Sequence, residues 1–355
     1  MRVLEAITPS RIGGAEVYVA ELCEQLPKLG IEVELFVPSG RPFVDYAASR
    51  GIESVNWKTH GKIDPITIFR LAKLIKSHKI DIVHTHLSTA SLLGAMAAKI
   101  AGVGSVAHVH GMNSATCFKR STAVIAVSEA VKTHLCEQGL DPNRVHVVHN
   151  GVDLGRFRPV NLADSKRKLG YDPGTHIFGV FGRLSEEKGQ QVAIEAMSIL
   201  LKNHPNARLV LGGDGKNRGE LAHAAESLGI VESVEFKGFI SDVRTLMSAC
   251  DGVIVPSIRE GFGLAAVEAM ALGRPVIASR VGGLPEIVVP DETGFLISPA
   301  DPNELACAME SLIANESSAA HMGKMGRDRA QNFFDLKKQI QAVAHILQCQ
   351  SPKTE

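Results

Sequence analysis

Short apolar runs alternate with helical patterns along nearly the whole chain, and this alternation restricts the fold more than any other feature of the sequence. Strands that are separated by helices pair in parallel and are joined by right-handed crossovers. The pattern occurs as two successive series, so it predicts an α/β chain with two doubly wound Rossmann-like domains. The strand runs are RVLEAI, EVELFV, DIVHTH, SVAHVH, AVIAVS and VHVVHN in the first half, and HIFGVFG, ARLVLGG, VEFKGF, GVIVPS, RPVIAS and GFLIS in the second.

The length of 355 residues also favours two domains, because single hydrophobic cores stop growing at about 250–300 residues. The polar stretch 155–175 contains glycine and proline and is expected to be a linker. We therefore predict an N-terminal domain at 1–158 and a C-terminal domain at 170–330, with a final helix at about 333–350 packed back on the first domain. Ligands of such sheets bind at the carboxyl ends of the strands, so two facing domains predict a site in the cleft between them.

Charge and cysteine content exclude several classes of protein. Lys+Arg and Asp+Glu are both 38, and a net charge of zero argues against a nucleic-acid binder. Residues 1–160 contain 18 basic and 14 acidic residues, a mild excess of +4 that suits an anionic acceptor or a membrane surface. Six scattered cysteines without a Cys-x-x-Cys pair indicate a reducing cytosol. No signal peptide and no apolar run of ~18–20 residues is present, so we expect a soluble cytoplasmic protein, with peripheral contact to the inner face of the membrane left open.

The segment EGFGLAAVEAMAL places one carboxylate, Glu268, in an otherwise apolar helical stretch. The backbone amides of residues 263–265, at the start of this helix, predict a binding site for a diphosphate. Glu260 precedes the helix, where its carboxylate can accept hydrogen bonds from ligand hydroxyls. Glu268 lies about 6 Å further along the axis, at the depth of a nucleotide's ribose, and ribose hydroxyls would satisfy a carboxylate that is costly to bury unpaired. The alternative is that Glu268 faces solvent.

Two cations follow the first strand of the second half. Arg183 and Lys188 stand in a loop before a helix, where they suit the charge that develops on a pyrophosphate leaving group, although surface cations are common. The next strand ends in a glycine-rich turn around Gly213, which is either a weak phosphate loop or an ordinary tight turn. The base of a nucleotide would lie against backbone near residues 237–242, which include Phe239.

In the first half, Gly13 and Gly14 lie between the first strand and the first helix, a position suited to backbone contact with a phosphate. A Gly-x-Gly-x-x-Gly motif and a P-loop are both absent from the sequence, which argues against a nicotinamide or flavin cofactor and against a P-loop ATPase. The chain also lacks Asp-x-Asp, so we expect no divalent metal, and cations and a helix terminus would bind the diphosphate instead.

Two His-x-His pairs end neighbouring predicted strands. With a period of two, the members of each pair, His84/His86 and His108/His110, point to the same face of a strand. Four imidazoles together suggest a metal site, but the sequence shows no acidic ligand close to them. Histidines at strand ends more often bind a substrate or the backbone, and His110 is best placed to reach into a cleft.

These motifs, taken in order, resemble the family 4 retaining glycosyltransferases of GT-B architecture over nearly the whole chain. The matching segments are GGAE at 13–16, DIVHTH at 81–86, HVHG at 108–111, AVIAVSEA at 123–130, NGVD at 150–153, GRLSEEKG at 182–189, GGDG at 212–215 and EGFGLAAVE at 260–268, the last of which is similar to the family's Glu-x7-Glu signature. The segment between HVHG and AVIAVSEA is shorter than in many members, which implies simpler acceptor recognition.

The resemblance implies a role for each candidate residue. Glu260 would contact the hydroxyls of a donor sugar, and Glu268 would hold the ribose. The remaining assignments are Arg183 and Lys188 to the diphosphate, Gly13 and Gly14 to a phosphate, His110 to the reacting sugar, and Gly261, Phe262, Gly263 and Leu264 to sugar and phosphate through the backbone. The implied reaction moves a hexose or N-acetylhexosamine, with retention and without metal, from a nucleoside diphosphate sugar to a glycan or lipid-linked acceptor, in cell-envelope polysaccharide or lipopolysaccharide synthesis.

Two other functions remain open at this point. A nucleotide-sugar 2-epimerase can use the same architecture, and so can a non-catalytic protein that binds sugar nucleotides. The donor base, the sugar and the acceptor cannot be deduced from the sequence. The basic helix at 69–79 is either an ordinary crossover helix or a segment that rests on anionic lipid.

Overall fold

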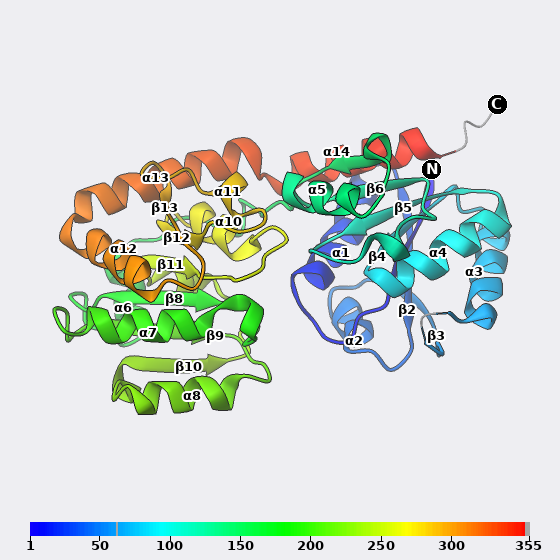
Figure 1. Cartoon of the computed structure of the whole chain (residues 1–355). Coiled ribbons are helices and arrows are strands. Elements are labelled where there is room, and N and C mark those ends of the chain that lie inside the picture. Colours follow the sequence, from blue (N-terminus) through cyan, green and yellow to red (C-terminus); the bar gives the residue numbers. More distant parts are fainter. Residues whose placement is uncertain (62, 352–355) are drawn as a thin grey trace. The chain divides into compact units, whose positions relative to one another are not determined.

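The computed structural model describes residues 1–61 and 63–351, which divide into two compact units (Figure 1). Unit 1 comprises Met1–Asn150 together with the segment that begins at Lys337, and unit 2 comprises Gly151–Leu336. Each unit contains one parallel sheet with helices on both faces, which confirms the predicted pair of doubly wound α/β domains. None of the helices within residues 1–61 and 63–351 combines the length and the apolar character that crossing a bilayer requires.

Unit 1 contains a seven-stranded sheet in the order β3-β2-β1-β4-β5-β6-β7, in which every neighbouring pair is parallel. Its strands are β1 (Arg2–Ile7), β2 (Glu32–Pro38), β3 (Ser54–Trp57), β4 (Ile82–His86), β5 (Gly104–Val109), β6 (Ala123–Ala126) and β7 (Val145–Val147). Its helices are α1 (Gly14–Gln25), α2 (Pro42–Ser49), α3 (Pro65–Ser77), α4 (Ser88–Ala101), α5 (Glu129–Glu137) and α14 (Leu336–Gln350).

Strand β1 shows how the two faces of this sheet are covered. Leu4 and Ala6 point to one face and pack with α3 and α4. Ile7 points to the other face and packs with α1 and α2. Because successive side chains of a strand alternate between the faces, a central strand with helices on both sides reads as a continuous apolar run. Glu5 interrupts this run, and it is completely buried.

Unit 2 contains a six-stranded parallel sheet in the order β10-β9-β8-β11-β12-β13. Its strands are β8 (Ile177–Phe181), β9 (Arg208–Gly212), β10 (Val234–Gly238), β11 (Gly252–Val255), β12 (Val276–Ser279) and β13 (Gly294–Ile297). Its helices are α6 (Leu162–Lys168), α7 (Gln190–Leu200), α8 (Arg218–Ser227), α9 (Arg244–Ser248), α10 (Leu264–Ala271), α11 (Leu284–Ile287), α12 (Pro302–Ala314) and α13 (Glu316–Phe333).

The stretch 155–175, expected to be a linker, is instead part of unit 2. It contains α6, whose Lys166 is nearly fully buried and pairs with Asp251 at 2.8 Å. The final helix, expected at about 333–350 on the first domain, is α14, which runs from Leu336 to Gln350, and the segment from Lys337 belongs to unit 1. Strand β3 was not predicted, since SVNW is short and lies at the edge of the sheet, where an apolar run is not required.

Unit 2 is an insertion into unit 1, and its two ends lie side by side. The amide of Val152 donates to the carbonyl of Phe334 at 2.8 Å, and the amide of Leu336 donates to the carbonyl of Val152 at 3.1 Å. Gly151 makes this close approach possible, because a Cβ at this position would lie 2.3 Å from Cα of Leu336. The segment where the chain enters unit 2 and the segment where it leaves unit 2 are therefore joined by backbone hydrogen bonds.

Candidate active site

In unit 2, the candidate residues gather where β8 and β11 lie next to each other. The order of strands along the chain reverses between these two, which is the position where open α/β sheets bind their ligands. The loop after β8 carries Arg183 and Lys188, and the loop after β11 carries Glu260. The loops are joined by a backbone hydrogen bond of 2.8 Å from the amide of Ile258 to the carbonyl of Glu187. The sheet topology therefore brings together residues that are about seventy positions apart in sequence.

Lys188 and Glu260 form an ion pair, with 2.5 Å between Nζ and Oε2. The side chains are 30% and 11% exposed, so the pair is partly shielded from water. The hydroxyl of Ser257 donates to the same carboxylate oxygen at 3.1 Å. Arg183 lies nearby in sequence and reaches Glu187 at 3.4 Å. Lys188, expected to bind the diphosphate, thus contacts Glu260, expected to bind the sugar. A ligand can replace this ion pair by placing a phosphate against Lys188 and a hydroxyl group against Glu260.

Two glycines allow the backbone of these loops to pack closely. Gly282 has a φ of +52°, and a Cβ there would lie 1.7 Å from the carbonyl oxygen of Glu260. Gly213 follows β9 with a φ of +147°, and a Cβ there would lie 1.9 Å from the carbonyl oxygen of Gly182. Both positions combine a left-handed backbone with contact to another chain segment, so only glycine fits. Packing therefore explains the glycine at position 213. This supports the interpretation as an ordinary tight turn, and a phosphate loop remains the alternative.

Helix α10 begins directly after Gly263, which has a φ of +112° and no side chain to cap the first amides. Leu264 is the first residue of the helix, and Glu268 follows one turn later. Glu268 is half-buried, so its carboxylate is not fully turned to solvent. Helix N-termini that are not capped by a side chain attract anions through their amides and the helix dipole. The arrangement offers an anion site with a carboxylate one turn deeper.

Two phenylalanines that were predicted to line the site have different environments. The ring of Phe262 is buried and contacts Phe334 edge-on at 5.8 Å between centroids, so the ring anchors the loop and leaves its backbone to a ligand. The ring of Phe239 is 69% exposed. It follows β10, whose last residue, Gly238, accepts a hydrogen bond of 2.8 Å from the amide of Gly213. Phe239 is therefore free to stack on a planar group from a position next to the glycine turn.

In unit 1, the corresponding reversal of strand order falls between β1 and β4. The loop after β1 ends at Gly13, which is the N-cap of α1, and Gly14 is the first helical residue. The carboxylate of Glu16 accepts a hydrogen bond of 3.0 Å from the amide of Gly13. A Cβ at Gly13 would lie 3.2 Å from that carboxylate oxygen. The two glycines thus place a helix terminus at the ligand-binding edge of this sheet.

The two His-x-His pairs form one buried cluster with Glu5. The register pairs Glu5 with His84 and His86 with His108, so the side chains lie on one face of three adjacent strands. Oε1 of Glu5 lies 2.9 Å from Nδ1 of His84, and Oε2 lies 2.7 Å from Nε2 of His86. Nδ1 of His86 lies 3.0 Å from Nε2 of His110. The contacts form a continuous chain from Glu5 through His86 to His110.

Burial keeps the imidazoles of His86, His108 and His110 neutral. It lowers the pKa of His86 and His108 well below the usual value, and the neighbouring imidazoles add to this effect. Burial also lowers the pKa of His110 to about 3. The rings of His108 and His110 stack with 4.5 Å between centroids, and Tyr18 of α1 contacts both rings edge-on. His110 is therefore a neutral ring in a fixed orientation at the end of β5.

No acidic residue was expected near the histidines, and the structure corrects this expectation. Glu5 is far away in sequence but lies on the neighbouring strand, and its only sequence signal was a charge inside an apolar run. His84, His86 and His108 place ring nitrogens within 4.8 Å of one another, a grouping that a metal ion can use. Glu5 already contacts the first two of them, and through His86 the same carboxylate is linked to His110.

Comparison with known proteins decides the family. The profile described as Glycosyltransferase Family 4 matches residues 12–156, and that described as Glycosyl transferases group 1 matches residues 163–329. The D-inositol 3-phosphate glycosyltransferase of Rhodococcus erythropolis is 30% identical in an alignment that covers 90% of this chain and 83% of the relative. The chain belongs to the family 4 glycosyltransferases. The predicted family resemblance is thereby confirmed.

Other members of the family are similar over similar lengths. The UDP-Gal:alpha-D-GlcNAc-diphosphoundecaprenol alpha-1,3-galactosyltransferase of Escherichia coli is 28% identical and covers 91% of this chain, which covers 90% of the relative. The crystal structure of Anabaena HepE in complex with UDP-glucose superposes with a TM-score of 0.89 at 26% identity, and the match covers 98% of this chain and 100% of HepE. The architecture of this glycosyltransferase is accordingly GT-B, as predicted.

Proposed function

We propose that this glycosyltransferase transfers a hexose or N-acetylhexosamine from a nucleoside diphosphate sugar to a hydroxyl group, with retention of the anomeric configuration. The observation that carries the proposal is the Lys188–Glu260 ion pair at the reversal of strand order in unit 2, directly before the N-terminus of α10. HepE binds UDP-glucose, and the Escherichia coli relative is named for UDP-Gal, so uridine diphosphate sugars are the first donors to test.

Each polar group of unit 2 has a role in this proposal. Lys188 and Arg183 neutralise the diphosphate, whose negative charge grows as the bond to the sugar breaks. The amides at the start of α10 bind the same group. Glu260, released from Lys188 when the phosphates bind, accepts hydrogen bonds from hydroxyls of the sugar. Glu268 accepts hydrogen bonds from the ribose.

The reaction requires one bond to form and one to break on the same face of the sugar. The acceptor oxygen attacks the anomeric carbon as the bond from that carbon to the β-phosphate oxygen breaks. The leaving phosphate oxygen takes the proton of the acceptor hydroxyl, so the products are the glycoside and the nucleoside diphosphate. No enzyme nucleophile is needed, and stabilisation of the leaving group dominates catalysis. Two cations and a helix terminus supply this stabilisation, so we propose that no divalent metal is required.

Unit 1 supplies the second set of groups. We propose that Gly13 and Gly14 contact a phosphate through the backbone and that His110 contacts the reacting sugar. The neutral state of His110 suits this role, because a neutral ring can donate or accept a hydrogen bond with a sugar hydroxyl without bringing a charge of its own. The chain Glu5–His86–His110 fixes which ring nitrogen carries the proton.

For the acceptor, we propose a lipid-linked glycan used in cell-envelope polysaccharide or lipopolysaccharide synthesis, with the enzyme at the cytoplasmic face of the membrane. The support is the name of the Escherichia coli relative, whose acceptor is a diphosphoundecaprenol-linked sugar. The mildly basic first part of the chain is consistent with an anionic acceptor.

The test is incubation of the purified protein with UDP-, GDP-, ADP- and dTDP-sugars, each with and without a diphosphoundecaprenol-linked N-acetylglucosamine acceptor. We expect release of nucleoside diphosphate that depends on the acceptor, and an α-linked product from an α-linked donor. A changed nucleotide sugar formed without acceptor would identify an epimerase instead. Binding without consumption of any donor, with every acceptor tried, would indicate a non-catalytic protein and refute the proposal.

A further inference from the structure

The outer face of α3 exposes large apolar side chains. Ile66 and Phe69 are 67% and 65% exposed, and Ile63, just before the helix, is 70% exposed. The opposite face of the helix is already apolar, because Ile68, Leu71, Ala72 and Ile75 are buried against the sheet and α4. An ordinary crossover helix needs only that inner face to be apolar. The exposed apolar side chains therefore need a partner outside the unit.

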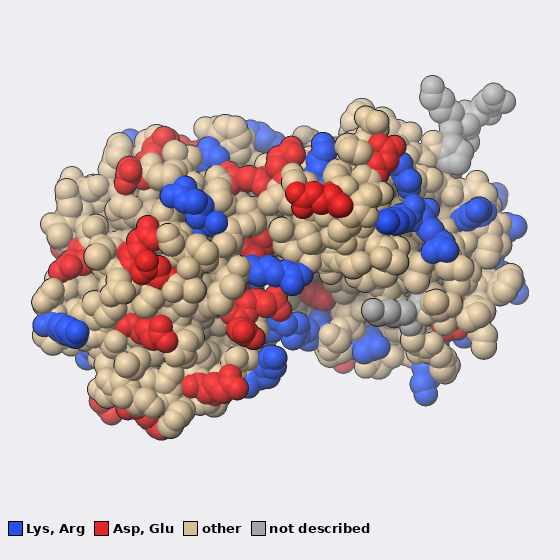
Figure 2. Space-filling view, viewed as in Figure 1, with Lys and Arg blue, Asp and Glu red and all other residues tan. Residues whose placement is uncertain are grey.

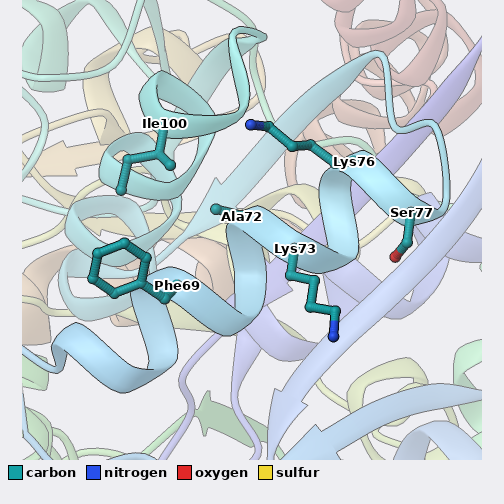
Figure 3. A pocket seen from close by; sticks show the side chains of 6 residues that line it. All are labelled: Phe69, Ala72, Lys73, Lys76, Ser77 and Ile100. Carbon is teal, nitrogen blue, oxygen red and sulfur yellow. The ribbon is translucent and has the colours of Figure 1, made fainter.

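A hollow of about 480 Å³ lies along the same surface, between α3 and the end of α4 (Figure 3). Phe69 and Ile100 form its apolar side, and Ile100 is 45% exposed. Lys73 and Lys76 line the hollow from the next turns of α3. An apolar wall next to ammonium groups matches the chemistry of an acyl chain beneath an anionic head group.

The exposed charges of α3 and α4 are all positive, and Asp64, which caps the start of α3, is buried. Helix α3 contains Arg70, Lys73 and Lys76 and no acidic residue, and α4 adds Lys99, again without an acidic residue. In Figure 2, the edge of unit 1 where Figure 1 places α3 shows blue side chains and little red. Arg70 lies 5.0 Å above the ring of Trp57, a contact that holds its charge near the surface. A surface of this kind is complementary to a negatively charged layer.

We propose that the face formed by Ile63, Ile66, Phe69 and Ile100 with Arg70, Lys73, Lys76 and Lys99 docks on an anionic lipid surface. The isoleucine and phenylalanine side chains enter the boundary between head groups and acyl chains, and the cations contact lipid phosphates. Helix α3 then lies along the membrane. The proposal concerns binding to lipid and does not depend on the donor or acceptor proposed above, so the two can fail separately.

The test is flotation of the full-length protein with vesicles of phosphatidylcholine alone and vesicles that also contain phosphatidylglycerol. We expect binding to the second kind only, and a loss of binding at high salt. Ile66→Ser combined with Phe69→Ser, and separately Lys73→Glu combined with Lys76→Glu, should each reduce the bound fraction at least about tenfold. The matched control combines Val231→Ser with Lys202→Glu, which changes one exposed apolar and one exposed basic residue of unit 2 and should bind like the wild type.

Thermal unfolding of all variants shows whether they fold, and a donor-consumption assay with a water-soluble acceptor should give equal rates for each. Absence of wild-type binding to the anionic vesicles would overturn the proposal. Equal binding by the α3 variants and the wild type would also overturn it, because the lipid would then bind elsewhere. A dimer in solution that the Ile66/Phe69 variant dissociates would assign this face to a second copy of the chain, which equally contradicts a lipid partner.

Discussion

Oε2 of Glu5 lies 2.7 Å from Nε2 of His86, and both side chains are completely buried. Nδ1 of the same imidazole lies 3.0 Å from His110, so Glu5 can fix the orientation of His110 without touching a substrate itself. A buried carboxylate in this position stabilises one arrangement of protons along the chain.

We expect Glu5→Gln to lower kcat roughly tenfold with little change in the KM for the donor, because His110 is held less firmly while donor binding in unit 2 is unaffected. The control is His84→Asn, which removes the other contact of Glu5 but leaves the path to His110 intact. Initial-rate kinetics on both variants check the prediction. A kcat that falls equally in both would mean that the cluster only supports the fold.

The ion pair between Lys188 and Glu260 gives a second prediction. Lys188→Met should lower kcat by about two to three orders of magnitude, because it removes a charge that stabilises the leaving diphosphate. Lys202→Met, at an exposed position, is the matched control and should leave the rate unchanged. Single-turnover rates with saturating donor separate this effect from weaker binding. A loss of binding alone, with the chemical step intact, would contradict the assigned role.

Substitution of Glu268 should weaken nucleotide binding more than it slows the chemical step. Glu268→Gln removes the charge that we assign to the ribose hydroxyls, so the Kd for the nucleoside diphosphate should rise about tenfold or more, since hydrogen bonds to charged groups contribute about 1.5–3 kcal/mol. Calorimetric titration with the ribonucleoside and the deoxyribonucleoside diphosphate measures the two Kd values. The wild type should bind the ribonucleotide more tightly, and the variant should bind both with the same Kd. Glu220→Gln, on the exposed side of α8, serves as control. An unchanged Kd for the nucleoside diphosphate would indicate that the carboxylate of Glu268 does not contact the ribose.

The buried imidazoles predict how stability depends on pH. His86, His108 and His110 stay neutral in the folded protein, whereas in the unfolded chain they bind protons near pH 6.5. Their contribution is fully present above about pH 6.5 and is lost as the pH falls, by up to about 1.4 kcal/mol per pH unit for each group. Trp57, the single tryptophan, lies in unit 1, so its fluorescence during urea unfolding reports on this unit.

The corresponding variant is His108→Leu, which removes one of the three titrating groups. It should flatten the pH dependence between about pH 6.5 and 5, whatever its effect on stability at neutral pH. A slope identical to that of the wild type would show that His108 does not titrate on unfolding in this range.

Metal dependence is the fifth prediction. Removal of divalent ions with EDTA should leave the transfer rate unchanged, because the proposed diphosphate site uses Arg183, Lys188 and the N-terminus of α10. Restoration of a lost activity by Mg²⁺ or Mn²⁺ would contradict this. Metal analysis of the untreated protein tests the cluster of His84, His86 and His108 separately, since a tightly bound ion there would survive brief chelation.

Local patterns in the sequence predicted most of the fold. All twelve expected strand runs contain strands, and the inner strands are mostly apolar because helices cover both faces of each sheet. Strand β3 escaped prediction because SVNW has only four residues, two of them polar, whereas the runs of the other edge strands, β7, β10 and β13, were recognised. The His-x-His pairs pointed to one face, as the strand period requires, but the neighbour of His84 depends on the order of strands in the sheet. The contact of Glu5 with His84 and the contact of Lys188 with Glu260 cannot be deduced from spacing along the chain. Both join neighbouring strands or loops at the point where the strand order reverses.

The backbone hydrogen bonds that join the two ends of unit 2, at Val152 and Leu336, have a consequence for the order in which the two units are synthesised and fold. A ribosome finishes all of unit 2 before it synthesises α14, which belongs to the unit whose first strand, β1, precedes unit 2 in the chain. Unit 2 can reach its native state first, while unit 1 remains incomplete until α14 has been translated. Loss of α14 would therefore destabilise the unit whose strands are all translated before unit 2.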